Sequence, residues 1–121
     1  MRNLFQIMDK SAMDGLKEIQ RIIDEWIKRN GGYWSPLAML ASVMEELGEM
    51  AREINHLEKF KPKKDKEPKN SLKLEIGDIL FSITCLANHY GVDLSDAVVA
   101  TMEKYEKRDA GRFTKREKSK T

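Results

Sequence analysis

Five acidic side chains stand at helical spacing in two short stretches of the sequence. The first stretch contains Glu45, Glu46 and Glu49, and the second contains Glu75 and Asp78. Residues three or four apart lie on one face of an α-helix, so carboxylates at this spacing can converge on one ion. Carboxylate oxygens are preferred ligands of hard cations such as Mg²⁺ and Mn²⁺. Two such helices facing each other would form a multi-carboxylate cation site.

The alternative is an ordinary solvated helix face, where acids usually alternate with bases four residues on. Residues 37–51 include three glutamates and no Lys or Arg, and residues 79–88 carry no formal charge. A helix that is apolar nearly all round is expected to be buried. Ionised carboxylates in such a helix are costly unless they are paired or bound to metal. A shared cation is therefore favoured over a solvated face.

A ferritin-type di-iron centre is another metal-site hypothesis. Such a site needs two ExxH motifs, each with a Glu three residues before a His. Glu53 and His56 provide one, but Leu86 stands three residues before His89, so the second is missing. We interpret His56 as a surface side chain. Cys85 is the only cysteine, which excludes an intrachain disulfide and fits a core residue in a reducing compartment.

Cap and stop residues divide the sequence into four expected helices. No alternation of apolar and polar residues predicts a strand, so the expected fold is all-α, a four-helix bundle-like domain. The helices are expected at about residues 9–30, 36–58, 71–90 and 94–109, with Gly111 closing the last. The second is expected to bury Leu40, Val43, Leu47, Met50, Ile54 and Leu57.

The length of 121 residues and the 40% hydrophobic content fit one small core, so we expect a single domain over residues 1–111. Residues 59–70 are expected to form a Lys/Pro-rich loop, and residues 112–121 a basic flexible tail. An acidic body with two basic segments favours an anionic ligand over specific nucleic-acid binding. No signal sequence or long apolar run is present, so we expect a cytoplasmic protein without membrane association.

These stretches resemble the MazG-like all-α nucleoside triphosphate pyrophosphohydrolases. The similarity rests on EELGE at 45–49, EIGDILFSI at 75–83 and KYEKRDAGRF at 104–113, and it covers about residues 34–113. It implies hydrolysis of a nucleoside triphosphate between the α- and β-phosphates, giving a monophosphate and pyrophosphate. The implied cofactor is Mg²⁺, with Mn²⁺ as an alternative.

The resemblance also implies roles for individual residues. The metal ligands would be Glu46, Glu49, Glu75 and Asp78. Glu45 would be a further ligand or would orient the attacking water, which makes Glu45 and Glu46 the catalytic candidates. Lys104 and Arg108 would hold the triphosphate tail, and Asn88 and Trp26 would line a nucleobase pocket. The alternatives are a solvated face for the two bases, a helix-interface amide for Asn88 and core packing for Trp26. Leu74 departs from the family pattern, because many relatives have Glu there.

The same residues also fit two other functions. Phosphoribosyl-ATP pyrophosphohydrolase belongs to the same superfamily and has similar motifs, usually in a shorter chain. A non-enzymatic helical binding or scaffold protein would use the same carboxylates structurally. The third helix has more apolar surface than one small bundle hides, so we expect a homodimer or homotetramer. The resemblance points the same way.

Overall fold

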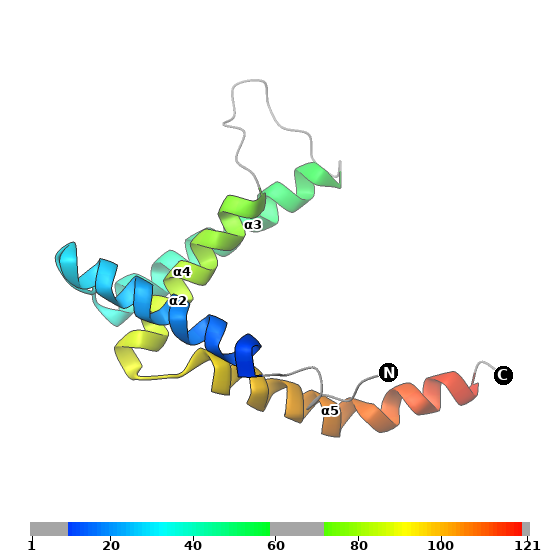
Figure 1. Cartoon of the computed structure of the whole chain (residues 1–121). Coiled ribbons are helices and arrows are strands. Elements are labelled where there is room, and N and C mark those ends of the chain that lie inside the picture. The colour runs from blue at the N-terminus through cyan, green and yellow to red at the C-terminus, as the bar shows by residue number, and fades with distance from the viewer. Residues whose placement is uncertain (1–9, 59–71, 120–121) are drawn as a thin grey trace. The chain divides into compact units, whose positions relative to one another are not determined.

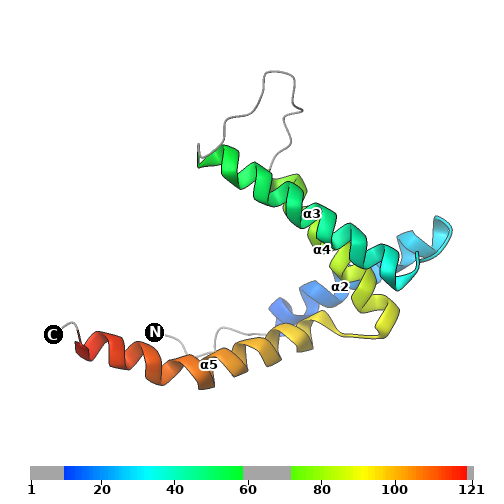
Figure 2. The same ribbon diagram turned by 180° about the vertical axis from the view of Figure 1, so that it is seen from behind.

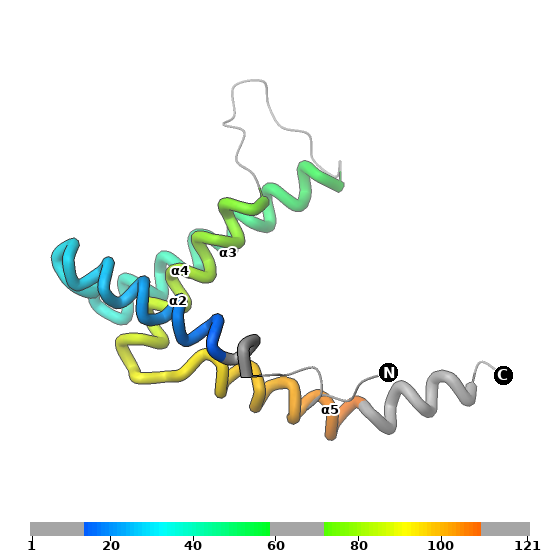
Figure 3. Tube along the Cα trace, viewed as in Figure 1, coloured from blue at the N-terminus to red at the C-terminus, as the bar shows by residue number. Residues whose placement is uncertain are grey.

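A computed structural model describes residues 10–58 and 72–119, with side chains at 14–58 and 72–109. Every regular element in these ranges is a helix (Figure 1). The helices are α2 (Lys10–Arg29), α3 (Pro36–Leu57), α4 (Leu72–Tyr90) and α5 (Leu94–Ser119). The all-α prediction is confirmed for this part of the chain. The expected Lys/Pro loop at 59–70 lies outside the described residues, which Figure 3 colours along the chain.

Local capping chemistry sets the helix boundaries near the expected residues. Ser35 adopts an extended conformation and its hydroxyl accepts a hydrogen bond from the Ala38 amide (3.2 Å), with Pro36 as the first helical residue. Gly31 and Gly91 follow α2 and α4 with φ of 106° and 67°. Such left-handed conformations favour glycine. These ends are therefore determined by residues within a few positions of each boundary.

Helix α5 is longer than the sequence predicts. Its start is as expected, because the Asp93 carboxylate accepts a hydrogen bond from the Asp96 amide (3.0 Å). Its end is not, because Gly111 lies inside the helix, which continues to Ser119. One glycine costs a helix only about 1 kcal/mol, and the Lys, Arg and Glu residues that follow are strong helix formers. The division into a body (1–111) and a tail (112–121) stays a prediction.

Of the described residues, 20–58 and 72–91 form one compact unit, built around α3 and α4. The two helices run side by side in opposite directions, as the front and back views show (Figures 1 and 2). The buried apolar side chains among the described residues all belong to these two helices: Met39, Val43, Ile79, Cys85 and Ala87. Because the pair is antiparallel, the middle of α3 faces the first half of α4, where the acidic stretches lie.

The expected core face of α3 is only partly correct. Val43 is buried, but Leu40, Leu47, Ile54 and Leu57 are exposed, and Met39 is buried in their place. Helix α4, expected to be buried all round, exposes Leu74, Ile76, Leu80, Phe81 and Ile83 by 37–60%. One partner helix can cover only one face of each helix. The unit therefore presents apolar side chains that nothing in the described part of the chain covers.

Of the described residues, 10–19 and 92–119 belong to the second compact unit, which contains α5 and the first half of α2. Within it the Lys17 ammonium lies 3.6 Å from the Asp93 carboxylate. Of the helices in the described ranges, none combines the length and the apolar character that a bilayer crossing requires.

Candidate metal and nucleotide site

Three carboxylates from α3 and α4 converge in the first unit. Glu46, Glu75 and Asp78 each place one oxygen within 4.8 Å of the other two. Glu46 is half-buried, Glu75 is 4% exposed and Asp78 is exposed. The group holds no histidine, which argues against the di-iron alternative. The arrangement joins the two acidic stretches that the sequence singled out.

Glu75 is the most informative member of this cluster. Its Oε2 atom is buried and has no hydrogen-bond partner among the described residues. A buried carboxylate oxygen without a partner is costly, and among the described residues no basic side chain forms an ion pair with Glu75. A divalent cation bound between the three carboxylates would complete the coordination of this oxygen. The donor set consists of carboxylate oxygens, which suit Mg²⁺ or Mn²⁺.

The electrostatics of Glu46 point in the same direction. Burial, the nearby charge of Asp78 and a hydrogen bond with Glu75 raise the pKa of Glu46 above its ordinary value of 4.5. The charges of Glu75 and Glu45 add to this effect. Like charges held together favour the protonated acid. A bound cation would remove this penalty and favour the ionised carboxylates.

Glu45 and Glu49 do not belong to the group of three. Both are exposed on α3, although Glu45 is close enough for its charge to affect Glu46. Residues one and three positions from Glu46 point about 100° and 60° away from it around the helix. Of the three glutamates on α3, only Glu46 lies in the group with Glu75 and Asp78 of α4. The metal or catalytic roles of Glu45 and Glu49 stay predictions.

A pocket of about 400 Å³ begins at the carboxylates and continues between α2, the following loop, α3 and α4. Glu46 and Asp78 line it together with four aromatic side chains: Trp26, Tyr33, Trp34 and Phe81. Trp26 and Phe81 meet edge to face, with ring centroids 6.0 Å apart. An aromatic wall suits a planar ring, and convergent carboxylates suit a cation. The pocket therefore has one apolar region and one anionic region.

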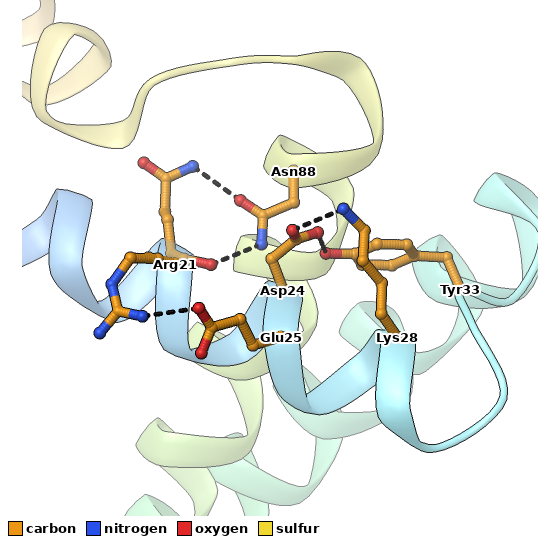
Figure 4. Close-up of polar contacts among 7 residues, drawn as sticks. Arg21, Asp24, Glu25, Lys28, Tyr33 and Asn88 are labelled. Carbon is orange, nitrogen blue, oxygen red and sulfur yellow. Dashed lines mark hydrogen bonds and ion pairs between the residues drawn. The ribbon is translucent and has the colours of Figure 1, made fainter.

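Hydrogen bonds fix the loop that carries Tyr33 and Trp34. The Tyr33 hydroxyl donates to Asp24 on α2, and Lys28 pairs with the same carboxylate at 2.9 Å (Figure 4). Both contacts hold the pKa of Asp24 below its usual range. Burial and the bond to Asp24 raise the pKa of Tyr33 to about 12, so its hydroxyl stays a neutral donor. The Tyr33 side chain is thus held against α2.

Trp26, expected from the sequence to line a nucleobase pocket, lines this pocket, and its contact with a base stays a prediction. The other three aromatic residues of the pocket, Tyr33, Trp34 and Phe81, are not predicted from the sequence. Tyr33 and Trp34 directly follow Gly31 and Gly32, so the pair of aromatics after a helix stop was the available sequence pattern. Phe81 lies three residues after Asp78 and was assigned only to the apolar part of its helix.

Asn88 forms hydrogen bonds between α4 and α2. Its Nδ2 donates to the Gln20 carbonyl and its Oδ1 accepts from Gln20 Nε2, both at 3.0 Å (Figure 4). The side chain does not line the pocket. These bonds join α4 to α2, as expected of a helix-interface amide, and a contact of Asn88 with a base stays a prediction.

Lys104 and Arg108 lie on α5, in the second compact unit. Both cations lie over the Tyr105 ring, at 5.1 and 4.7 Å from its centroid. Arg108 also makes two 3.0 Å hydrogen bonds to Asp109. Both residues are exposed, and their contact with a triphosphate stays a prediction.

Comparison with known proteins identifies relatives of this arrangement. Residues 34–113 match the MazG nucleotide pyrophosphohydrolase domain. The chain is 46% identical to the uncharacterized protein YpjD of Bacillus subtilis (strain 168) over 106 residues, 87% of this chain and 96% of YpjD. It is 36% identical to YvdC of the same organism over 87 residues, 67% of this chain and 82% of YvdC.

Two solved structures have the same fold. The crystal structure of YpjD from Bacillus subtilis superposes with a TM-score of 0.69 at 46% identity, covering 78% of this chain and 95% of that one. A Bacillus-conserved MazG protein, described as a nucleotide pyrophosphohydrolase, superposes with a TM-score of 0.63 at 39% identity. That match covers 78% of this chain and 91% of the other.

Proposed function

Because the chain belongs to the MazG nucleotide pyrophosphohydrolase family, we propose that it hydrolyses nucleoside triphosphates to a monophosphate and pyrophosphate with Mg²⁺. One observation carries the proposal: the pocket with four aromatic side chains also reaches Glu46 and Asp78 of the carboxylate cluster. A nucleotide has a planar base at one end and phosphates at the other. The aromatic region of the pocket suits the base, and the carboxylate region suits a cation bound to the phosphates.

The residues of the cluster would bind the cation and keep it at the phosphate end of the pocket. Glu75 contributes the buried oxygen that lacks a partner, and Glu46 and Asp78 complete the group. A divalent cation there supplies charge neutralisation for the phosphates and lowers the pKa of a bound water. Glu45, one residue from Glu46 and exposed, is proposed to orient the attacking water. Lys104 and Arg108 are proposed to bind phosphate oxygens that the cation does not contact.

We also propose that the active form is a homodimer or homotetramer. Leu37, Leu40, Met44 and Leu47 on α3 are 44–79% exposed, and Leu74 and Leu80 on α4 are 60% and 55% exposed. Apolar surface of this extent on adjacent helices is typical of a subunit interface. A second copy of the chain would cover it with the same residues, as in a symmetric dimer.

Pyrophosphate release from purified protein tests the proposal. The substrates are the common NTPs, the dNTPs and phosphoribosyl-ATP, each with Mg²⁺, with Mn²⁺ and with a chelator. We expect turnover of at least one nucleoside triphosphate, its loss with the chelator, and a reduction of at least about 100-fold in Glu75→Gln. Glu103→Gln, an exposed glutamate on α5, is the matched control and retains activity.

The alternative functions give different results in the same assay. Turnover of phosphoribosyl-ATP alone would assign the chain to that branch of the superfamily. No pyrophosphate from any substrate with either cation would refute the enzymatic proposal and favour a helical binding protein. Circular dichroism of each variant separates loss of the site from loss of the helices.

A further inference from the structure

A pair of serine hydroxyls bridges α3 and α4 beside the carboxylates. Ser42 Oγ and Ser82 Oγ are 3.2 Å apart, and both side chains line the pocket. Ser82 is 8% exposed and Ser42 is half-buried. One helical turn separates Ser42 from Glu46, and one turn separates Ser82 from Asp78. The serine pair therefore lies in the pocket wall, one helical turn from the carboxylates on each helix.

On the side of the serine pair away from the carboxylates, the pocket wall is apolar. Met39 and Cys85 are both buried, both line the pocket, and each lies three residues from the serine of its own helix. Because α3 and α4 are antiparallel, the side chains along the wall that they form change in character about every helical turn, or about every 5.4 Å. Along the wall, the apolar pair is followed by the two hydroxyls and then by the carboxylates. Trp26 and Phe81 add aromatic surface to the same pocket.

The serine pair has unused hydrogen-bonding capacity. A hydroxyl offers one donor and two acceptor positions, so one serine donates to the other and the acceptor's own hydrogen stays available. Helical hydroxyls often bond instead to the carbonyl four residues earlier, as Thr84 does with Leu80 (2.6 Å). Ser42 and Ser82 bond to each other rather than in this way. A donor and several acceptor positions are thus left on two side chains that line the pocket, next to the apolar residues Met39 and Cys85.

We propose that Ser42 and Ser82 form the sugar subsite and bind a hydroxyl group of the nucleotide's pentose. The inference rests on the proposed function, since the base and the phosphates then occupy the apolar and carboxylate regions. In a nucleotide the sugar lies between the base and the phosphates. In the pocket wall the serine pair lies between apolar side chains and carboxylates in the same way. The pair thereby becomes a determinant of sugar preference.

The test compares three triphosphates with one base, which carry ribose, 2′-deoxyribose and 2′,3′-dideoxyribose. Pyrophosphate release gives kcat and KM for wild type, Ser42→Ala and Ser82→Ala. Wild type is expected to lose about 10-fold in kcat/KM when the bound hydroxyl is removed from the sugar. In both serine variants the ratio of kcat/KM for the sugar with the bound hydroxyl to kcat/KM for the sugar without it is expected to fall towards 1. A wild-type loss between ribose and 2′-deoxyribose identifies the 2′-hydroxyl, and a loss between 2′-deoxyribose and 2′,3′-dideoxyribose identifies the 3′-hydroxyl.

Thr84→Val is the matched control. It removes a buried hydroxyl from α4 that does not line the pocket, and it leaves the sugar ratio unchanged. Equal losses with all three sugars in the serine variants would overturn the inference and leave a purely interhelical bond. A stronger preference for the hydroxyl-bearing sugar in the variants would overturn it as well. If Ser82→Ala does not fold, the more exposed Ser42→Ala decides.

Failure of this inference is distinguishable from failure of the proposed function. Hydrolysis by wild type with an unchanged sugar ratio in the variants overturns the sugar subsite alone. No hydrolysis of any of the three triphosphates by wild type, together with none of the wider substrate panel, overturns both.

Discussion

Replacement of Glu75 by Gln is expected to stabilise the metal-free protein while it removes the metal site. Glu75 is 4% exposed, shares its site with Glu46 and Asp78, and has a buried oxygen without a partner. Gln keeps the shape of the side chain, removes the negative charge, and brings an amide that its two acidic neighbours can accept from. A buried unsatisfied polar group costs about 1–3 kcal/mol. The substitution is therefore expected to raise the free energy of unfolding by about that amount.

Thermal unfolding with and without Mg²⁺ measures both effects. For a domain of this size, about 1–3 kcal/mol corresponds to a rise in Tm of roughly 4–12 °C without cation. Wild type is expected to gain about 2.7 kcal/mol when Mg²⁺ is present at 100 times its Kd, because the cation binds only the folded state. In the Glu75→Gln variant this gain is expected to disappear.

Glu49→Gln is the matched control for this experiment. It removes one negative charge from the same acidic stretch, but the side chain is exposed and lies outside the group of three. Its metal-free stability is expected to stay within about 0.5 kcal/mol of wild type. The reasoning is refuted if Glu75→Gln lowers the metal-free stability and keeps the full Mg²⁺ gain. Loss of that gain in Glu49→Gln would add Glu49 to the ligands.

Three further predictions concern other parts of the first unit. The pKa of Glu46 is raised in the folded protein, so its contribution to stability without cation is present below about pH 4.5 and is lost as pH rises through the raised pKa. Urea unfolding at a series of pH values measures this loss of stability. An equal dependence of stability on pH in Glu46→Gln would contradict the prediction. Trp26→Ala is expected to raise KM by roughly 10-fold or more through lost stacking, with kcat less affected; an unchanged KM would assign Trp26 to packing against Phe81. Leu80→Glu, at a position 55% exposed, is expected to convert the oligomer to monomers in sedimentation velocity, and a monomeric wild type would show that the apolar face has another purpose.

The helices and the acidic pattern could be predicted from short-range sequence features. Ser35 and Pro36 specify the start of α3, and Gly91 the end of α4, through local backbone chemistry. The error at Gly111 has the same origin, since one glycine lowers helix stability without preventing the helix from continuing. The contribution of Tyr33 and Trp34 to the pocket could not be predicted, because they belong to a loop that a long-range side-chain bond from Tyr33 to Asp24 joins to α2.

By itself the sequence determined that the protein is helical and that it belongs to the MazG nucleotide pyrophosphohydrolase family. It also determined that the acidic residues lie in one short stretch of each of two helices. Only the tertiary structure decided which acids meet. The spacing of three residues treats Glu46 and Glu49 alike, but they differ by about 60° around α3, and the antiparallel contact with α4 selects Glu46. The same contact pairs Ser42 with Ser82 and buries Glu75. Side-chain convergence depends on how two helices align, and the periodicity of one helix carries no information about that alignment.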